Sequence, residues 1–159
     1  ENIMYFALGG HPGFNVPLNG SQKFQDWYLE FDSVKPAKQI LLNSAFITED
    51  IVPYPFREEK FIDFDLPTQK EIIKTIILQD MSNKVTLKSK KCDKSITLFY
   101  PDMKYLAFWM VDSAGFLCIE PWSGLPSYYQ KIDDIESKRD MTLLKSNESY
   151  SNTFTVTIK

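Results

Sequence analysis

The chain contains one histidine, His11, and a glutamate, Glu120, whose side chains could exchange protons with a bound molecule. Glycines and a proline surround His11 (residues 9–13), so the backbone can turn sharply there and fix the position of the imidazole. An imidazole changes its charge near neutral pH and can therefore act as a general acid. A structural histidine in a turn would show the same local pattern, and the residue type alone leaves both interpretations open.

Glu120 lies at the end of a predicted strand, residues 116–120, and Pro121 is expected to end the strand's ladder. Because side chains alternate along a strand, Glu120 shares its face with Cys118. A carboxylate in partly apolar surroundings is costly unless it is paired. Glu120 is therefore either the partner of a basic residue or a proton acceptor at the mouth of a cleft. Trp122 beside it offers a ring that could stack on a sugar.

Several other catalytic and metal-binding patterns are absent from the sequence. It contains no GxSxG, P-loop or GxGxxG motif. The neighbouring carboxylates Asp133 and Asp134 diverge and indicate a solvated helix start rather than a glycosidase pair. No metal site is predicted, because there is no second histidine and Cys92 and Cys118 lack the spacing of metal ligands. Whether these two cysteines pair stays open.

The elements that must position these residues are mostly strands. Apolar runs and alternation predict strands at residues 3–8, 27–31, 84–88, 95–100, 105–111, 116–120 and 153–158. The polar residues 90–94 predict a hairpin between the strands at 84–88 and 95–100, and residues 112–115 predict a turn. Residues 105–111 are apolar on both faces, which is typical of a central strand. Residues 153–158 show the clearest alternation.

Helix signals are short and confined to two places. Residues 68–71 and 133–136 each resemble a capping box and predict one or two helical turns. Residues 46–64 contain Pro53, Pro55 and several charges, which predicts a long loop or an excursion at a sheet edge. No repeat or domain boundary is visible. We therefore expect one all-β domain over residues 1–159.

Composition and charge exclude several classes of protein. The chain has 159 residues, 43% of them hydrophobic, and a formal net charge of −3. This charge argues against binding to nucleic acid, which requires clustered cations. The one basic run, residues 88–91, is interpreted as a solvated hairpin end. No apolar stretch reaches the ~18 residues of a membrane span, and a cytoplasmic location is the default expectation.

Two segments together resemble signature motifs of the aldose 1-epimerase (galactose mutarotase-like) family. They are Gly10-His-Pro-Gly-Phe-Asn15 and Cys118-Ile-Glu-Pro-Trp-Ser-Gly124, and the similarity is greatest to the family's lactose-operon-associated branch. The resemblance runs over the whole chain and matches the C-terminal half of family members. It implies a large twisted antiparallel β-sandwich, with the sugar cleft on one sheet and the other half of the domain as a partner.

The resemblance implies that His11 is the acid and Glu120 the base of a reaction that interconverts the α and β anomers of a free hexose. The base removes the O1 proton, the acid protonates the ring oxygen, and the ring opens to an aldehyde. This chemistry needs no metal or coenzyme. An imidazolium at His11 is expected to lower the pKa of Glu120 and keep it ionised.

The resemblance also places Trp122 and Asn15 among the sugar contacts. A further acidic contact is expected just before residues 75–78, but the sequence has Lys74 there, with Glu71 and Asp80 nearby. This departure leaves an alternative function open, a non-catalytic carbohydrate-binding or sugar-sensing protein on the same scaffold.

Overall fold

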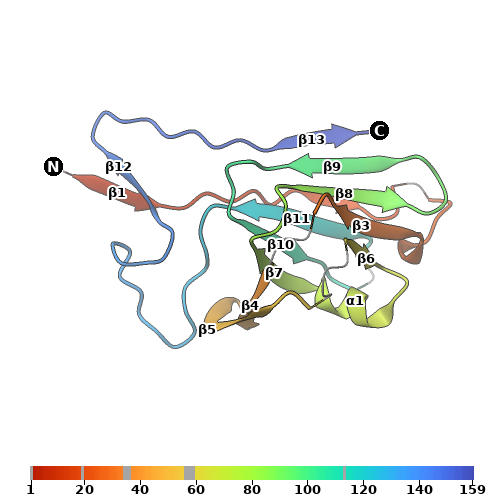
Figure 1. Ribbon diagram of the computed structural model, residues 1–159, viewed down its shortest axis with the longest axis horizontal. Helices are drawn as coiled ribbons and strands as arrows, with labels where there is room; N and C mark the ends of the chain where they lie inside the picture. The colour runs from red at the N-terminus through yellow and green to blue at the C-terminus, as the bar shows by residue number, and fades with distance from the viewer. Residues whose placement is uncertain (1, 19, 34–36, 56–59, 113) are drawn as a thin grey trace.

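The computed structural model describes residues 2–18, 20–33, 37–55, 60–112 and 114–159. These residues form strands with little helix, and every pairing between named strands is antiparallel. The expected all-β class is therefore confirmed (Figure 1). Within the described ranges, no helix is long and apolar enough to cross a membrane.

The largest sheet has six strands and contains the predicted base Glu120, and the predicted acid His11 lies just before its edge strand β2 (Gly13–Asn15). In spatial order it contains β2, β11 (Phe116–Trp122), β10 (Tyr105–Trp109), β7 (Thr75–Gln79), β4 (Lys38–Asn43) and β5 (Phe46–Pro53).

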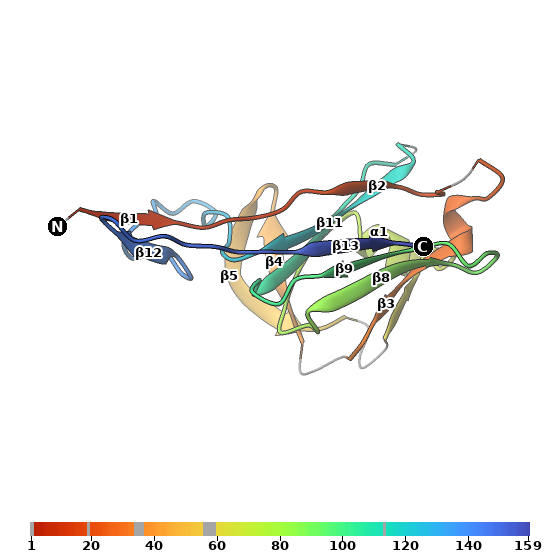
Figure 2. The ribbon, with the colours of Figure 1, turned by 90° about the horizontal axis from the view of Figure 1, so that it is seen from above.

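A five-stranded sheet packs against it. Its order is β13 (Thr155–Ile158), β9 (Ser95–Phe99), β8 (Lys84–Ser89), β3 (Trp27–Phe31) and β6 (Phe61–Asp63). A 3-10 turn, η1 (Phe24–Asp26), precedes β3, and helix α1 (Pro67–Ile72) precedes β7. The third sheet pairs β1 (Ile3–Phe6) with β12 (Thr142–Lys145). It projects from one end of the two larger sheets (Figures 1 and 2).

The main core fills the space between the two large sheets. Leu106 and Phe108 of β10 point into it, whereas Tyr105 and Ala107 belong to a second apolar cluster on the opposite face of the six-stranded sheet. Residues on both faces of β10 are therefore buried, as its continuous apolar sequence predicts. Burying a side chain such as Phe108 stabilises the fold by ~1.5–3 kcal/mol.

Most of the predicted strands are confirmed, with small differences in their bounds. β3 has the predicted bounds, and β8 and β9 form the predicted hairpin. The prediction that Pro121 ends the β11 ladder is wrong, because β11 continues to Trp122. The backbone of Pro121 faces the N-terminal segment, where its carbonyl accepts from the N–H of Gly10. Its missing N–H therefore does not interrupt the pairing of β11 with β10.

Residues 153–158 form a shorter strand than predicted, and it has no buried face. All four residues of β13 are exposed, including Ile158 at 73% exposure. β13 pairs only with β9 at the sheet edge, where Figure 1 shows the chain ending. Alternation thus predicted the strand correctly, although neither of its faces packs into the core.

The predicted loop over residues 46–64 is wrong in its main part. It contains β5 and β6, and residues 56–59 lie outside the described ranges. Both strands lie at sheet edges, where Pro53 costs no ladder hydrogen bond. The expected edge excursion is therefore confirmed.

Of the two predicted helical segments, only the first is a helix. Residues 68–71 lie within α1. Residues 133–136 form no helix; a turn covers residues 135–137, and the carboxylate of Asp134 accepts from the N–H of Glu136. This local bond offers the backbone an alternative to helical pairing. One residue of the predicted turn at 112–115, Ser113, is outside the described part of the chain.

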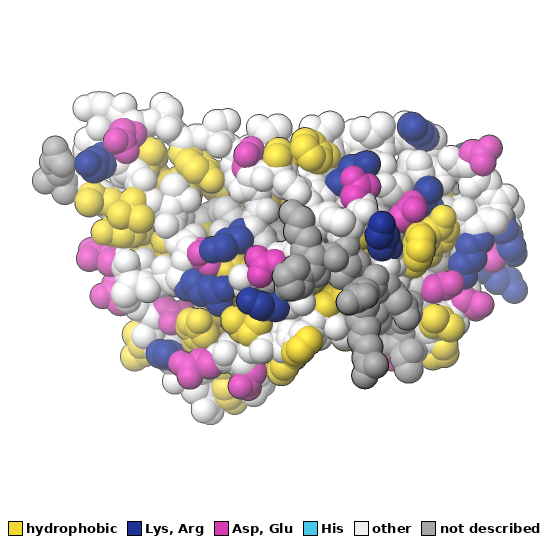
Figure 3. Space-filling model, viewed as in Figure 1, with side chains coloured by type: hydrophobic (Ala, Val, Ile, Leu, Met, Phe, Trp, Pro, Cys, Tyr) yellow, Lys and Arg dark blue, Asp and Glu magenta, His cyan; other side chains and the backbone are white. Residues whose placement is uncertain are grey.

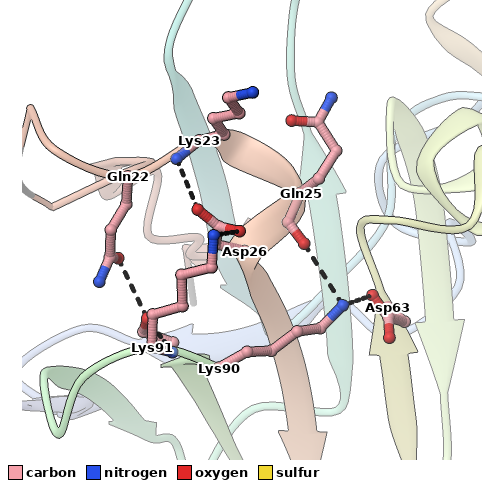
Figure 4. A network of polar contacts seen from close by, with 8 residues as sticks. Gln22, Lys23, Gln25, Asp26, Asp63, Lys90 and Lys91 are labelled. Carbon is pink, nitrogen blue, oxygen red and sulfur yellow. Dashed lines mark hydrogen bonds and ion pairs between the residues drawn. The ribbon is translucent and has the colours of Figure 1, made fainter.

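The basic run at residues 88–91 forms ion pairs at the hairpin end. Lys88 pairs with Glu30, and Figure 4 shows Lys90 reaching Asp63 and Lys91 reaching Asp26. Figure 3 shows the same interspersion of basic and acidic side chains over one face of the molecule. The run is thus balanced by carboxylates, as expected of a solvated hairpin end.

Candidate functional site

The strand β11 places Glu120 on the face of the six-stranded sheet that points away from the main core. Alternation sends Leu117 and Ile119 into the main core, and Cys118, Glu120 and Trp122 to the other face. Glu120 lies opposite Ala107 of β10 in the ladder. Its side chain is only 3% exposed, although a carboxylate is among the groups least often buried.

His11 is held against this strand by the backbone on both sides of it. The N–H of Gly10 donates to the carbonyl of Pro121 at 2.9 Å, and the N–H of Ile119 donates to the carbonyl of Pro12 at 3.1 Å. His11 therefore cannot shift along β11 without breaking paired backbone groups. Its side chain is 65% exposed, so the imidazole reaches from solvent toward a buried carboxylate.

The glycines before His11 serve close packing. A Cβ atom at Gly9 would lie 2.7 Å from the Trp122 ring, and one at Gly10 would lie 2.8 Å from the Phe154 ring. Among the described glycines, only Gly115 has a positive φ, of 68°. A positive φ is therefore not the reason for glycine at positions 9 and 10. Glycine is needed at both positions because aromatic rings lie against the backbone.

The side chains of His11 and Glu120 are in contact. The distance from His11 Nδ1 to Glu120 Oε1 is 3.3 Å. The side chain of Trp122 also donates a hydrogen bond to Glu120. The ring of Trp109 meets the imidazole edge-on, with centroids 6.0 Å apart. The Glu120 carboxylate thus has two polar partners, and the His11 imidazole contacts the Trp109 ring.

These residues line a cavity of about 240 Å³ on the outer face of the six-stranded sheet. Its lining is largely apolar, and its polar groups are few. The lining includes His11, Glu120, Trp109, Trp122, Ser44, Thr75, Leu42, Ile77, Ala107 and Pro126. Mostly apolar walls with a few converging polar groups are typical of small-molecule sites.

The pKa of the Glu120 carboxyl is raised above its usual value. Burial is the largest cause, and it outweighs the opposing effects of the positive field of His11 and the hydrogen bond from Trp122. The expectation that the field of His11 lowers this pKa is confirmed, but burial outweighs it, so the net shift is upward. A buried carboxylate with a raised pKa holds a proton more strongly and is a better base near neutral pH.

The raised pKa predicts how stability depends on pH. Between the unfolded and folded pKa values of Glu120, the folded chain binds more protons, so stability falls as pH rises from about 4.5 through the folded pKa. Glu120→Gln removes this dependence. The melting temperature of the variant minus that of the wild type should therefore increase with pH over this window. Glu136→Gln, at an exposed turn, controls for the lost charge. A constant difference would contradict the prediction.

The other two positions predicted to contact the sugar, Asn15 and Lys74, do not line the cavity. Asn15 is exposed on β2, opposite Phe116. The ammonium of Lys74 pairs with Asp112 at 2.6 Å and with Glu71 at 2.7 Å, and both partners raise its pKa. The structure thus brings together His11, Glu120 and Trp122, but not Asn15 or Lys74.

Sequence reasoning missed other residues of the lining. Trp109 ends β10 on the same face as Ala107, so alternation could have identified it. Ser44 and Ala45 lie in the turn between β4 and β5. They carried no recognisable signal, because β4 was not predicted and β5 was predicted only as part of a long loop or an edge excursion.

The fold is that of a galactose mutarotase-like β-sandwich. No family model matches the chain. It is 28% identical over 163 residues to the plasmid and chromosomal LacX proteins of Lactococcus lactis subsp. lactis, covering 99% of this chain and 54% of each relative.

Two solved structures show the same likeness in three dimensions. A galactose mutarotase related enzyme from Lactobacillus acidophilus has a TM-score of 0.84 at 25% identity, over 99% of this chain and 53% of that one. A galactose mutarotase-like protein from Lactobacillus casei ATCC 334 has a TM-score of 0.75 at 29% identity, over 99% and 54%. The predicted sandwich and the resemblance to this family's lactose-operon-associated branch are confirmed. The chain spans about half the length of these relatives.

Proposed function

We propose that the protein is an aldose 1-epimerase that interconverts the anomers of a free hexose. The contact between His11 and the buried Glu120 is the observation that carries the proposal. In a cyclic hexose, the anomeric oxygen O1 and the ring oxygen O5 are both bonded to C1. Ring opening removes a proton from O1 and adds one to O5, so the two groups that exchange these protons must lie close together. The imidazole of His11 and the carboxylate of Glu120 do so at 3.3 Å.

In the proposed reaction, Glu120 takes the O1 proton while His11 gives a proton to O5. The C1–O5 bond breaks, and C1 becomes an aldehyde carbon. After rotation about C1–C2, the C5 hydroxyl oxygen attacks the other face of C1. Its proton returns to His11, and Glu120 gives its proton back to O1. Both residues thus end each cycle in their starting states, and removing either one is expected to lower the rate by about 10²–10⁴-fold.

Two features of the cavity support these roles. Burial raises the pKa of Glu120, which strengthens it as a base, and the Trp122 hydrogen bond fixes its orientation. The ring of Trp122 also lines the cavity, where an indole face can pack against the C–H face of a sugar. The proposal needs no cofactor, because both proton transfers use side chains of this chain.

Polarimetry on freshly dissolved α-galactose or α-glucose tests the proposal, with the protein as its gene encodes it. We expect the decay of optical rotation to accelerate in proportion to protein concentration. Sugar binding without acceleration would instead support the second candidate, a non-catalytic sugar-binding protein. That candidate is favoured because Lys74 stands where an acidic sugar contact is expected, and its ammonium pairs with Glu71 and Asp112 outside the cavity lining.

We further propose that the cavity is completed by another stretch of polypeptide, equivalent to the remaining half of the relatives, so that residues 1–159 form half of a cytoplasmic sandwich domain. The cavity of about 240 Å³ is smaller than the ~300–1,000 Å³ of typical ligand sites.

The isolated chain is therefore expected to bind galactose or glucose with a Kd weaker than ~1 mM, equivalent to about 4 kcal/mol of binding free energy. Calorimetric titration measures this, with near-UV circular dichroism to verify folding. Micromolar affinity would contradict it.

A further inference from the structure

A third side chain, Cys118, converges on the acid–base pair and has no part in the proposed reaction. It precedes Glu120 by two residues on β11, so both side chains lie on one face of the strand. One ligand-type atom each from His11, Cys118 and Glu120 lies within 4.8 Å of the other two. Cys118 is 4% exposed and forms no disulfide.

One of the three spacings between these atoms already matches that of a tetrahedral metal site. Zinc binds nitrogen and oxygen at about 2.0–2.1 Å and sulfur at about 2.3 Å, so neighbouring ligand atoms lie ~3.3–3.6 Å apart. His11 Nδ1 and Glu120 Oε1 already stand 3.3 Å apart. The other two spacings are within 4.8 Å, so movement of the side chains would have to bring all three atoms to one centre.

The backbone that carries the three ligands is fixed before any ion arrives. Cys118 is paired on both sides, with Trp109 of β10 and with Gly13 of β2. Rigid ligand placement of this kind favours tight coordination.

We propose that His11, Cys118 and Glu120 form a binding site for a divalent transition-metal ion of the zinc type. Their nitrogen, sulfur and oxygen atoms suit Zn²⁺ and Co²⁺ better than Mg²⁺ or Ca²⁺, which prefer oxygen alone. The thiol proton leaves to solvent on binding, and the thiolate and carboxylate then balance the two charges of the ion. His11 and Glu120 line the cavity, so the fourth coordination position is open to it.

The sequence did not predict this site because its ligands lack the short spacing of known metal motifs. Cys118 and Glu120 are two residues apart on a strand, and His11 reaches them only through the pairing of its segment with β11. One consequence rests on the proposed function. An ion on Glu120 occupies the oxygen that would accept the O1 proton, so the ion should inhibit mutarotation.

Titration with Co²⁺, a coloured substitute for Zn²⁺, tests the site in the absence of sugar. For the wild-type protein, we expect one equivalent to bind with a thiolate-to-cobalt charge-transfer band in the near ultraviolet, and Zn²⁺ to remove that band. Cys118→Ala should abolish the band and weaken binding at least ~10-fold. Cys92→Ser removes the other cysteine, which lies before β9 in the other sheet, and should leave the spectrum unchanged.

The absence of a charge-transfer band in the wild type, or an unchanged band in Cys118→Ala, would overturn the proposal. Alanine avoids burying a hydroxyl group at position 118, and near-UV circular dichroism verifies that the variant is folded. His11→Asn retains both cysteines and should also weaken Co²⁺ binding at least ~10-fold. Because the titration requires no turnover, a protein that binds Co²⁺ but lacks mutarotase activity would disprove only the proposed function.

Discussion

Glu120→Gln is expected to reduce the rate of hexose mutarotation by about 10²–10⁴-fold. Glutamine has nearly the same shape and can still accept the hydrogen bond from Trp122, but its amide cannot take the O1 proton near neutral pH. The substitution also removes a buried charge from a site where burial already disfavours that charge. The variant should therefore fold, and the loss should appear in kcat measured by polarimetry.

Glu136→Gln is the matched control for this variant. Glu136 is exposed in the turn after residue 133, away from the cavity lining, so the same chemical change there should leave turnover unaffected. A rate for Glu120→Gln close to that of the wild type would mean that another group accepts the proton. Equal losses in both variants would indicate a general effect of charge.

The strands that build the site could be predicted because their sequences carry two separate signals. Apolar residues on both faces indicated that β10 is central, and alternation placed Cys118 and Glu120 on one face of β11. Neither signal placed His11 beside Glu120. That contact depends on backbone hydrogen bonds between segments far apart in the chain, and only the family resemblance indicated it in advance.

Burial explains what could not be predicted. Charge signs alone suggested a lowered pKa for Glu120, whereas desolvation on the covered face of the sheet raises it. The alternation in β13 correctly predicted a strand but carried no information on its burial: the strand pairs only at the edge of its sheet and stays exposed. The charges and prolines of residues 46–64 suggested a loop, because edge strands tolerate residues that a central strand does not.

His11→Asn is expected to cause a comparable loss of about 10²–10⁴-fold in turnover, because asparagine cannot donate a proton to O5. The His11 side chain is 65% exposed, so its removal leaves no large void in the core and the variant should fold. Lys94→Asn, on the exposed turn between β8 and β9, introduces the same residue away from the site and should retain wild-type turnover.

The double variant His11→Asn/Glu120→Gln shows whether the two residues act in one step. If the imidazole and the carboxylate exchange protons with the same ring-opening transition state, losing either one removes most of what both provide. The double variant should therefore be only slightly slower than the slower single variant in polarimetric assays. Losses that multiply would indicate that His11 and Glu120 contribute independently, for instance because one of them only binds the sugar.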